Sequence, residues 1–385
     1  MRIETEIISN VTSLDFWKDD WEALFAQGEQ EPSVSYEWTS ALLRNHIRPG
    51  DRVYLLIFSM DNRKIGFLPL IASQSRFLGQ NLISLSPLSE RYDTHTDILF
   101  HGEFQDCLAA LLQTLRSTAI RWDIFRMGRL LEHQPLLENL ETQLQSNKYL
   151  RRIQYEPPSF YLTLPESMNS YLARRSGKFR NYLRRAEKKI GALGVVHFDV
   201  IANQVNLEFA YEQMLTIERN SWKHEHGTAI SAISHQTAFY HALCLGAAAV
   251  ARLHLSFLYL DDQPVAYNLG YLHNRRYYYL KTSYDEKYRA VGVATFARAR
   301  LIETLIGQGV QSLDFPGEPY EWEQQWTEEL RWHKSIALFN SNFPARIFYV
   351  LSKLRRALKK QPEGKVLEFC DARALQPPKD QKKAN

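Results

Sequence analysis

The segment from Arg289 to Ala294 is the part of this sequence best suited to holding a phosphate group. It reads Arg-Ala-Val-Gly-Val-Ala and stands between a strand-like segment and the apolar run VATFARARLIETLI. Small residues at a helix start leave backbone N–H groups free, and the helix dipole adds positive charge there. A neighbouring arginine would add a charge-assisted hydrogen bond. An ordinary turn is the alternative, but the pattern suits a pyrophosphate, held by Arg289, Val291, Gly292, Val293 and Ala294.

Two stretches concentrate basic residues. Residues 174–189 carry eight lysines and arginines along a helical pattern with an apolar stripe. This face is either solvated or binds an anionic partner, with Lys178 and Arg180 as expected substrate contacts. Residues 346–360 form a second basic amphipathic stretch. It either touches an anionic membrane surface or packs its apolar side on the second lobe of the chain.

Other common reaction centres are missing from the sequence. His224 and His226 have no further ligands at a spacing typical of zinc sites, so a polar loop and no metal are expected. The sequence contains no Walker loop, no G-x-S-x-G elbow and no C-x-x-C pair. The three cysteines, Cys107, Cys244 and Cys370, are widely spaced, and the first two stand in apolar helical runs. Structural thiols are therefore expected rather than a catalytic cysteine.

Both halves of the chain alternate helix and strand patterns. The first half has helical patterns around residues 16–25, 38–47 and 104–119, and a hairpin of two β-rich runs about the turn at 60–63. The second half has helices at 206–221, 235–246 and 293–307, with a hairpin about the turn at 261–264 and further strands at 277–285 and 310–315. At a constant offset, Leu55, Phe58, Asp61, Ile65 and Phe67 align with Leu255, Leu258, Asp261, Val265 and Tyr267. The alignment favours a duplication, although two unrelated hairpins can align by chance.

The fold class expected from these patterns is α/β, with a mixed sheet and two tandem lobes. A length of 385 residues and 45% hydrophobic residues suit two globular lobes. A Pro-Pro pair and other breaker residues near 145–165 mark the boundary. The expected domains are a first lobe at 1–155, a second lobe at 156–345, and a basic amphipathic helix with a disordered tail at 346–385.

The overall charge and hydropathy favour a cytoplasmic protein. The N-terminal residues lack a signal-peptide pattern, and no apolar run is long enough for a membrane span. The net charge of +4 does not demand a polyanionic partner. Peripheral contact with the inner membrane face stays open because of the second basic stretch.

The second lobe resembles a known family through the order and spacing of several segments. These are GKFRNYLRRAEKKI (177–190), IERNSWKHEHGTAI (217–230), FLYLDDQPVAYNLGYL (257–272), YYYLKTSYDEKYRAVGVA (277–294) and LDFPGEPYEWEQQW (313–326). They resemble the GNAT acyltransferases, and among these the CelD-like proteins associated with cellulose and exopolysaccharide biosynthesis, which are related to the FemAB aminoacyl ligases. The resemblance implies tandem GNAT-like lobes and a coenzyme A pyrophosphate site at 289–294. The first lobe lacks the corresponding loop pattern, so it is expected to be a degenerate lobe without a donor site.

The family's reaction needs a base that removes a proton from the amine and a hydrogen-bond donor that stabilises the oxyanion. It also needs an acid that gives a proton to the leaving thiolate. The resemblance implies Glu218 as base, in the IERNSW segment, with Trp222 nearby as a substrate contact. Asp285 and Asp314 are the next candidates for the base. In the alternative interpretation, each of them caps a helix or braces a loop. Tyr284 and Tyr320 are candidate proton donors to the thiolate, and Lys281 is a candidate contact for a phosphate or acceptor carboxylate. Tyr320 is followed by Glu321, where many relatives carry a lysine, which indicates a different acceptor.

The resemblance thus implies an acyl-CoA-dependent N-acyltransferase with acetyl-CoA, or another acyl-CoA, as donor and no metal. The acceptor it implies is an amine, such as an amino sugar of a surface polysaccharide or a phosphorylated precursor. The alternatives are a FemAB-like transferase that uses aminoacyl-tRNA, favoured by the basic helix, and a non-catalytic GNAT-like component of a polysaccharide system. Nucleic acid is a partner only in the tRNA alternative.

Overall fold

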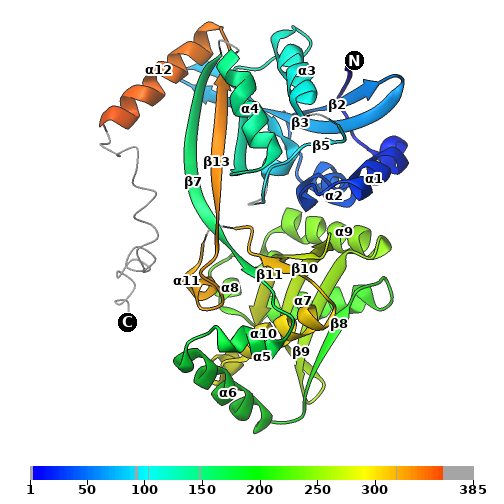
Figure 1. The fold of residues 1–385 in the computed structure, drawn as a ribbon, viewed down its shortest axis with the longest axis vertical. Coiled ribbons are helices and arrows are strands. Elements are labelled where there is room, and N and C mark those ends of the chain that lie inside the picture. The colour runs from blue at the N-terminus through cyan, green and yellow to red at the C-terminus, as the bar shows by residue number, and fades with distance from the viewer. Residues whose placement is uncertain (1–2, 92–93, 103, 147–148, 318, 359–385) are drawn as a thin grey trace. The chain divides into compact units, whose positions relative to one another are not determined.

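The computed structural model describes residues 3–358, except residues 92–93, 103, 147–148 and 318. The chain divides into two compact units, coloured along the sequence in Figure 1. Unit 1 comprises Met1–Ser159, Gly317–Glu321 and Arg331–Asn385, and unit 2 comprises Phe160–Pro316 and Trp322–Leu330. Each unit contains paired strands with helices on both faces, and β7 (Leu150–Thr163) contributes residues to both units. The expected mixed α/β class is confirmed.

The sheet of unit 1 has the strand order β1-β2-β3-β4-β6-β13-β7, with β5 paired to β3. Its strands are β1 (Glu4–Ser9), β2 (Arg52–Met60), β3 (Arg63–Phe77), β4 (Gln80–Pro87), β5 (Leu99–Phe100), β6 (Ile124–Leu131), β13 (Leu330–Phe339) and the first part of β7 (Leu150–Thr163). Strands β4 and β6 are parallel, and among the described residues they pair only at Ser84–Leu85 and Ile124–Phe125. The two strands therefore diverge after a short contact.

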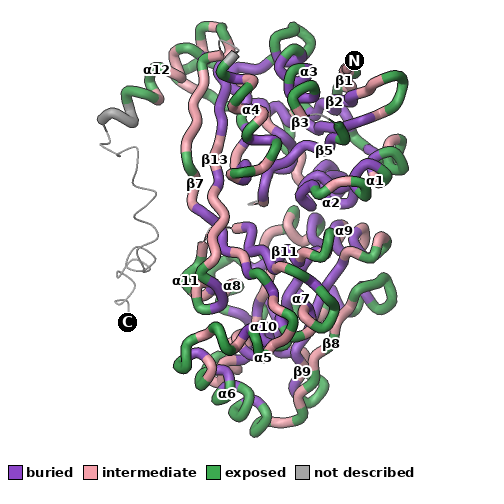
Figure 2. The backbone as a smooth tube through the Cα atoms, viewed as in Figure 1, coloured by how far each residue is buried: buried purple, intermediate pink, exposed green. Residues whose placement is uncertain are grey.

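Helices cover both faces of the unit 1 sheet. The helices are α1 (Lys18–Gln27), α2 (Tyr36–Asn45), α3 (Phe104–Arg116), α4 (Pro135–Ser146) and α12 (Phe343–Leu358). Short 3-10 turns occur at Asp15–Trp17, Pro32–Val34 and Leu88–Arg91. The large core lies between α3, α4 and strands β2 to β13 (Figures 1 and 2). On the other face Trp21 of α1 stacks on Phe67 of β3, with 4.7 Å between ring centroids.

The sheet of unit 2 has the order β7-β12-β11-β10-β9-β8. Its strands are the last residues of β7, β8 (Val196–Ile201), β9 (Leu253–Leu260), β10 (Gln263–His273), β11 (Arg276–Tyr284) and β12 (Ser312–Asp314). Its helices are α5 (Met168–Ala173), α6 (Gly177–Gly191), α7 (Leu207–Arg219), α8 (Trp222–Glu225), α9 (Ser234–Ala249), α10 (Val293–Gly307) and α11 (Glu321–Gln324), with 3-10 turns η4 (Ile230–Ala232) and η5 (Glu286–Val291).

Helices α6 and α10 lie on one face of this sheet, where Ala186 and Ile190 of α6 join Phe296 and Ala297 of α10 in a common core with β9 and β10. Helix α7 contacts β10 and β11 from the other face, and α9 contacts β9. The alternation of side chains along each strand produces these two layers, because neighbouring residues point to opposite faces.

The two hairpins predicted by the sequence offset have the same turn geometry. Asp61 and Asn62 join β2 to β3 with φ values of 51° and 61°, and Asp261 and Asp262 join β9 to β10 with φ values of 48° and 63°. Two successive left-handed residues are typical of a type I′ hairpin turn, which Asn and Asp tolerate. The match in position and conformation strengthens the case for a duplication.

The end of the chain follows a course that the sequence patterns did not indicate. Strand β13 pairs antiparallel with β6 of unit 1, although residues 330–339 had been expected in the second lobe. Pro157 and Pro158, expected at a boundary, lie inside β7, directly before the division between the two units at Ser159 and Phe160. Helix α12 had been expected either at a membrane or on the second lobe, but it packs Ala345, Phe348 and Tyr349 against Phe339 and its neighbours in unit 1. The expected tail beyond residue 358 lies outside the described residues, as does Cys370.

Within the described part of the chain, every helix is too short or too polar to cross a membrane. Cys107 and Cys244 are buried free thiols, as expected of structural cysteines. Burial raises the pKa of Cys244 to about 12, so its thiolate is not formed near neutral pH.

Candidate functional site

The 289–294 segment leads directly into helix α10, as predicted. The turn η5 ends at Val291, Gly292 has φ 80°, and α10 begins at Val293. The amide groups of the first helical turn have no intrahelical acceptors, and the helix dipole makes this end positive. Gly292 suits the left-handed conformation because it has no Cβ. The segment therefore has the backbone geometry of an anion-binding helix start.

Helix α6 lies beside this helix start. A Cβ built on Gly292 would stand 3.2 Å from both the Ala186 Cβ and the Tyr182 Oη atoms. The Thr295 Oγ1 atom is 3.4 Å from the Tyr182 hydroxyl oxygen, and Lys189 Nζ is 3.5 Å from the Ala290 carbonyl oxygen. The basic helix of the sequence thus brings a lysine to the same segment. A side chain at position 292 would crowd these two atoms of α6, which would have to shift.

The arginine of the segment is accessible to a ligand from solvent. Arg289 is mostly exposed and pairs with Glu286 at 2.9 Å, three residues earlier. An exposed ion pair of this kind contributes little free energy. Replacing the Glu286 carboxylate by a ligand phosphate as the partner of Arg289 therefore costs little free energy.

Strand β11 leaves part of one edge open next to this segment. It pairs in parallel with β12 from Arg276 to Tyr278, whereas β11 itself continues to Tyr284. A register shift opposite Leu269 and Gly270 leaves Leu280 out of the pairing with β10. Among the described residues, β12 does not pair with β11 beyond Tyr278. Backbone groups on this edge are positioned to pair with an extended ligand.

Glu218 is fully buried at the end of α7 and holds a polar cluster together. One carboxylate oxygen accepts hydrogen bonds from Tyr267 Oη at 2.6 Å and Lys223 Nζ at 2.9 Å, and the other accepts from the Ile230 amide at 2.9 Å. Lys223 also donates to the Thr282 carbonyl oxygen at 2.6 Å. Burial lowers the pKa of Lys223, while the adjacent Glu218 carboxylate opposes that shift. These contacts suit a brace between α7, η4 and the strands better than an accessible base.

Tyr284 and Asp285 lie where β11 meets η5. Burial raises the pKa of Tyr284, and the Glu286 carboxylate adds to the rise. Asp285 caps η5, because its Oδ1 atom accepts a hydrogen bond from the Lys287 amide at 2.9 Å. Asn220 Nδ2 lies 3.5 Å from the other carboxylate oxygen. Both candidates are partly exposed and adjoin the 289–294 segment.

The remaining candidates are dispersed. Asp314 is fully buried at the end of β12, 4.0 Å from the Arg276 guanidinium. Tyr320 is exposed and belongs to unit 1. Lys281 lies 5.5 Å from the ring centroid of Tyr240.

The expected substrate contacts on unit 2 differ in exposure. Trp222 is half-exposed and meets the His226 ring edge-on. Lys178 is exposed on α6. Arg180 instead donates to the carbonyl oxygens of Leu172 and Arg175, at 3.3 and 2.8 Å, and so braces the turn between α5 and α6.

The sequence patterns missed a buried polar group inside α10. Arg298 is buried, its Nε atom donates to Tyr279 Oη at 3.2 Å, and its guanidinium lies 3.9 Å from the ring centroid of Trp322. Tyr279 in turn donates to Asn268 Oδ1 at 2.6 Å. The helical period could have identified Arg298 as buried. Leu301 and Ile302 follow it by three and four residues, so they lie on the same face of α10 and are themselves buried.

Comparison with known protein families identifies the domain that contains this site. Residues 177–324 match the model of the acetyltransferase (GNAT) domain family. This stretch includes α6, the open edge of β11 and the helix start at 289–294. Unit 2 therefore has a GNAT-type acyltransferase fold, and the resemblance expected at this level is confirmed. The narrower CelD-like assignment stays a prediction, and comparison with curated proteins gave no match.

Solved structures with a similar fold extend over most of the chain. FemX has a TM-score of 0.57 at 11% identity, over 90% of this chain and 99% of FemX. The C-terminal domain of a putative lysylphosphatidylglycerol synthetase from Agrobacterium fabrum has a TM-score of 0.53 at 11% identity, over 88% and 96%. A conserved protein of unknown function from Bacteroides thetaiotaomicron has a TM-score of 0.54 at 9% identity, over 86% and 99%. At these identities the likeness concerns the fold alone.

Proposed function

We propose that unit 2 transfers an acyl group from acyl-CoA, with acetyl-CoA as the expected donor, to an amine. The observation that carries the proposal is the left-handed Gly292 at the start of α10, inside the stretch that matches the GNAT domain family. The helix start would bind the pyrophosphate through the amides that follow Gly292, with Arg289 and Lys189 adding positive charge. The open edge of β11 would pair with the extended arm of the donor.

The residues beside the helix start supply plausible acid–base groups. The amine nitrogen attacks the thioester carbonyl carbon, the carbon–sulfur bond breaks, and the sulfur leaves as a thiolate. We assign proton transfer to that thiolate to Tyr284, because it adjoins the 289–294 segment and its phenol is protonated at neutral pH. Asp285 takes the proton that the amine loses, directly or through water. Glu218 acts as a positioning residue that holds Lys223 and Tyr267 in place.

The acceptor is proposed from the family resemblance: an amino sugar of a surface polysaccharide or its precursor. Transfer from aminoacyl-tRNA is a second candidate, favoured by the basic face of α6 beside the 289–294 segment. The two donors differ in salt dependence, because tRNA binding releases many counterions and weakens steeply as salt rises.

Calorimetric titration with acetyl-CoA tests the donor. Wild-type protein is expected to bind with a dissociation constant of roughly 1–100 µM. Arg289→Ala should weaken binding by about three- to tenfold, because one charge-assisted hydrogen bond is lost at an exposed site. Arg300→Ala is the matched control, since Arg300 forms an equivalent exposed pair with Glu303 at 2.7 Å further along α10. Saturable, salt-sensitive binding of tRNA without any binding of acyl-CoA would replace this proposal with the second candidate.

Helix α12 presents an apolar face that supports a peripheral membrane contact. Phe343, Val350 and Leu354 are exposed on that face, while Ala345 on the opposite face is fully buried. Arg346 and Lys353 are exposed beside the apolar face. An apolar face flanked by cations fits an anionic lipid surface, which we propose as its partner.

Vesicle co-sedimentation measures this contact. The protein is expected to bind vesicles of phosphatidylglycerol and phosphatidylcholine but not pure phosphatidylcholine, and Phe343→Ser with Leu354→Ser should reduce binding by about tenfold or more. Phe209→Ser, which changes an exposed phenylalanine of α7, should have no effect. Equal binding by the α12 variant would exclude this face as the contact.

A further inference from the structure

The strands β6, β13 and β7 of unit 1 have two chemically different faces. Phe125, Met127, Ile336 and Leu338 point into the core beneath α3 and α4. The alternate residues point the other way, and on β6 and β7 they include charged and amide side chains. They are Arg126 and Gly128 on β6, Ser335 and Ala337 on β13, and Arg152, Gln154 and Glu156 on β7.

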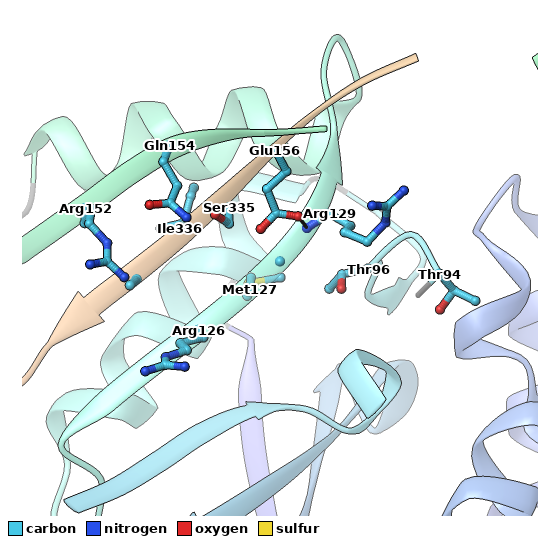
Figure 3. A pocket seen from close by; sticks show the side chains of 12 residues that line it. Thr94, Thr96, Arg126, Met127, Arg129, Arg152, Gln154, Glu156, Ser335 and Ile336 are labelled. Carbon is cyan, nitrogen blue, oxygen red and sulfur yellow. Dashed lines mark hydrogen bonds between the residues drawn. The ribbon is translucent and has the colours of Figure 1, made fainter. Parts of the chain in front are cut away.

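A cavity of about 320 Å³ lies over this second face (Figure 3). Strand β13 runs between β6 and β7, and its residues on the cavity side, Ser335 and Ala337, are small. The larger side chains of the two flanking strands surround the space above them. Thr94 and Thr96 close one end of the cavity from the loop that precedes β5. The volume is at the lower end of that of small-molecule sites.

The described lining of this cavity is predominantly cationic. It contains the guanidinium groups of Arg126, Arg129 and Arg152 and one carboxylate, from Glu156. The Arg129 guanidinium already donates to the Gly317 carbonyl oxygen at 3.0 Å. Figure 3 shows Arg126 and Arg152 extending toward the same end of the cavity from the two flanking strands. The Glu156 carboxylate accepts a hydrogen bond from the Arg129 amide at 3.2 Å. Guanidinium groups stay charged at all physiological pH values, so this lining gives the cavity a positive charge that favours an anionic ligand.

The threonine end of the cavity is held rigidly by buried contacts. His95, between the two threonines, lies 3.1 Å from a Glu31 carboxylate oxygen and 3.5 Å from Ser159 Oγ. The Ser33 hydroxyl donates to the His95 carbonyl oxygen at 2.6 Å, and the Thr96 amide donates to the Arg129 carbonyl oxygen at 3.3 Å. The lining is therefore ordered before any ligand arrives, which lowers the entropy cost of binding.

One polar atom of the lining points to a ligand independently of the arginines. Thr94 Oγ1 is buried and makes no hydrogen bond to any described residue. A buried hydroxyl without a partner costs free energy, which a ligand or water would recover.

We infer that this cavity binds a small polar molecule through an oxyanion, a phosphate or a carboxylate, held between Arg126 and Arg152. Planar guanidinium groups bind both kinds of oxyanion through paired hydrogen bonds. Thr94, Gln154 and Ser335 then receive the uncharged polar part of the ligand. The site lies wholly in unit 1 and is independent of the acyl-CoA site proposed in unit 2.

Calorimetric titration of the full chain with inorganic phosphate and, separately, with succinate tests the inference. Wild-type protein is expected to bind one of the two probes with a dissociation constant of about 1 mM or tighter. The probe that binds identifies the oxyanion. The double variant Arg126→Gln, Arg152→Gln should bind it at least about tenfold more weakly, because both charge-assisted contacts are lost. Ala337→Leu keeps every charge but fills the floor of the cavity, and it should weaken binding as well.

Arg76→Gln is the matched control, because Arg76 is an exposed arginine of β3 outside the cavity lining. It should bind the probe like the wild type. The inference is overturned if wild-type protein binds neither probe at about 10 mM, if the double variant binds as well as wild type while its circular dichroism is unchanged, or if Arg76→Gln loses as much affinity. A variant such as Gly292→Glu should keep this binding, which separates the result from that of the acyl-CoA titration.

Discussion

Glutamate in place of Gly292 is expected to weaken acetyl-CoA binding by at least about 100-fold, or roughly 2.7 kcal/mol. Three effects act together. A side chain at φ 80° is strained by about 1–2 kcal/mol. Its Cβ stands 3.2 Å from Ala186 and Tyr182 of α6, which must shift. The carboxylate also adds a negative charge where the pyrophosphate is proposed to bind, at a cost of about 1 kcal/mol or more.

Gly307→Glu provides the control for this result. Gly307 is the last residue of the same helix, is exposed, and has no atom within 4 Å of the position of a Cβ. Calorimetry should give this variant the wild-type affinity. A similar loss of affinity in both variants would contradict a donor site at the start of α10, and so would full affinity in Gly292→Glu.

Alanine in place of Glu218 is expected to lower the free energy of unfolding by about 3–5 kcal/mol. Both oxygens of this fully buried carboxylate are hydrogen-bonded, and its removal leaves Lys223 as a buried cation that has lost its counter-charge. Tyr267 would lose the acceptor of its hydroxyl, which adds a desolvation cost. Urea denaturation, followed by circular dichroism, measures the difference.

A double-mutant cycle separates the ion pair from the other contacts. Adding Lys223→Met to Glu218→Ala should recover about 1–2 kcal/mol, because the buried charge is then removed. Glu212→Ala on the same helix is the control. Glu212 is exposed and lies 3.9 Å from Arg219, so its loss should change the free energy by less than about 0.5 kcal/mol. A loss below about 1 kcal/mol for Glu218→Ala would mean that solvent reaches this cluster.

The local elements of both units could be predicted from the sequence. The β2–β3 and β9–β10 hairpins form where Asp and Asn residues follow β-rich runs, because those residues accept the left-handed turn. Helix α10 begins at Val293, directly after Gly292, because glycine readily adopts the left-handed conformation found there. Short-range turn chemistry and side-chain period determine these features, so distant parts of the chain are not needed to find them.

The roles of Glu218 and Arg180 could not be predicted in the same way. Both are polar residues in helical patterns, and such a pattern is equally compatible with solvent, a ligand or a partner within the protein. The contacts that decide between these come from segments far away, such as Tyr267 for Glu218. The buried Arg298 is the reverse case, because its helical position alone indicates burial.

The sequence by itself determined the mixed α/β class, the repeated hairpins and the helix start after Gly292, because each depends on residues close together in the chain. Only the tertiary structure decided that β13 lies between β6 and β7 and that small residues of β13 form the floor of an arginine-lined cavity. Strand pairing between residues more than 200 positions apart, as between Phe339 and Ile124, leaves no local pattern. The backbone edge of one strand can pair with that of many others. Which strands become neighbours depends on how both faces of the whole sheet are buried.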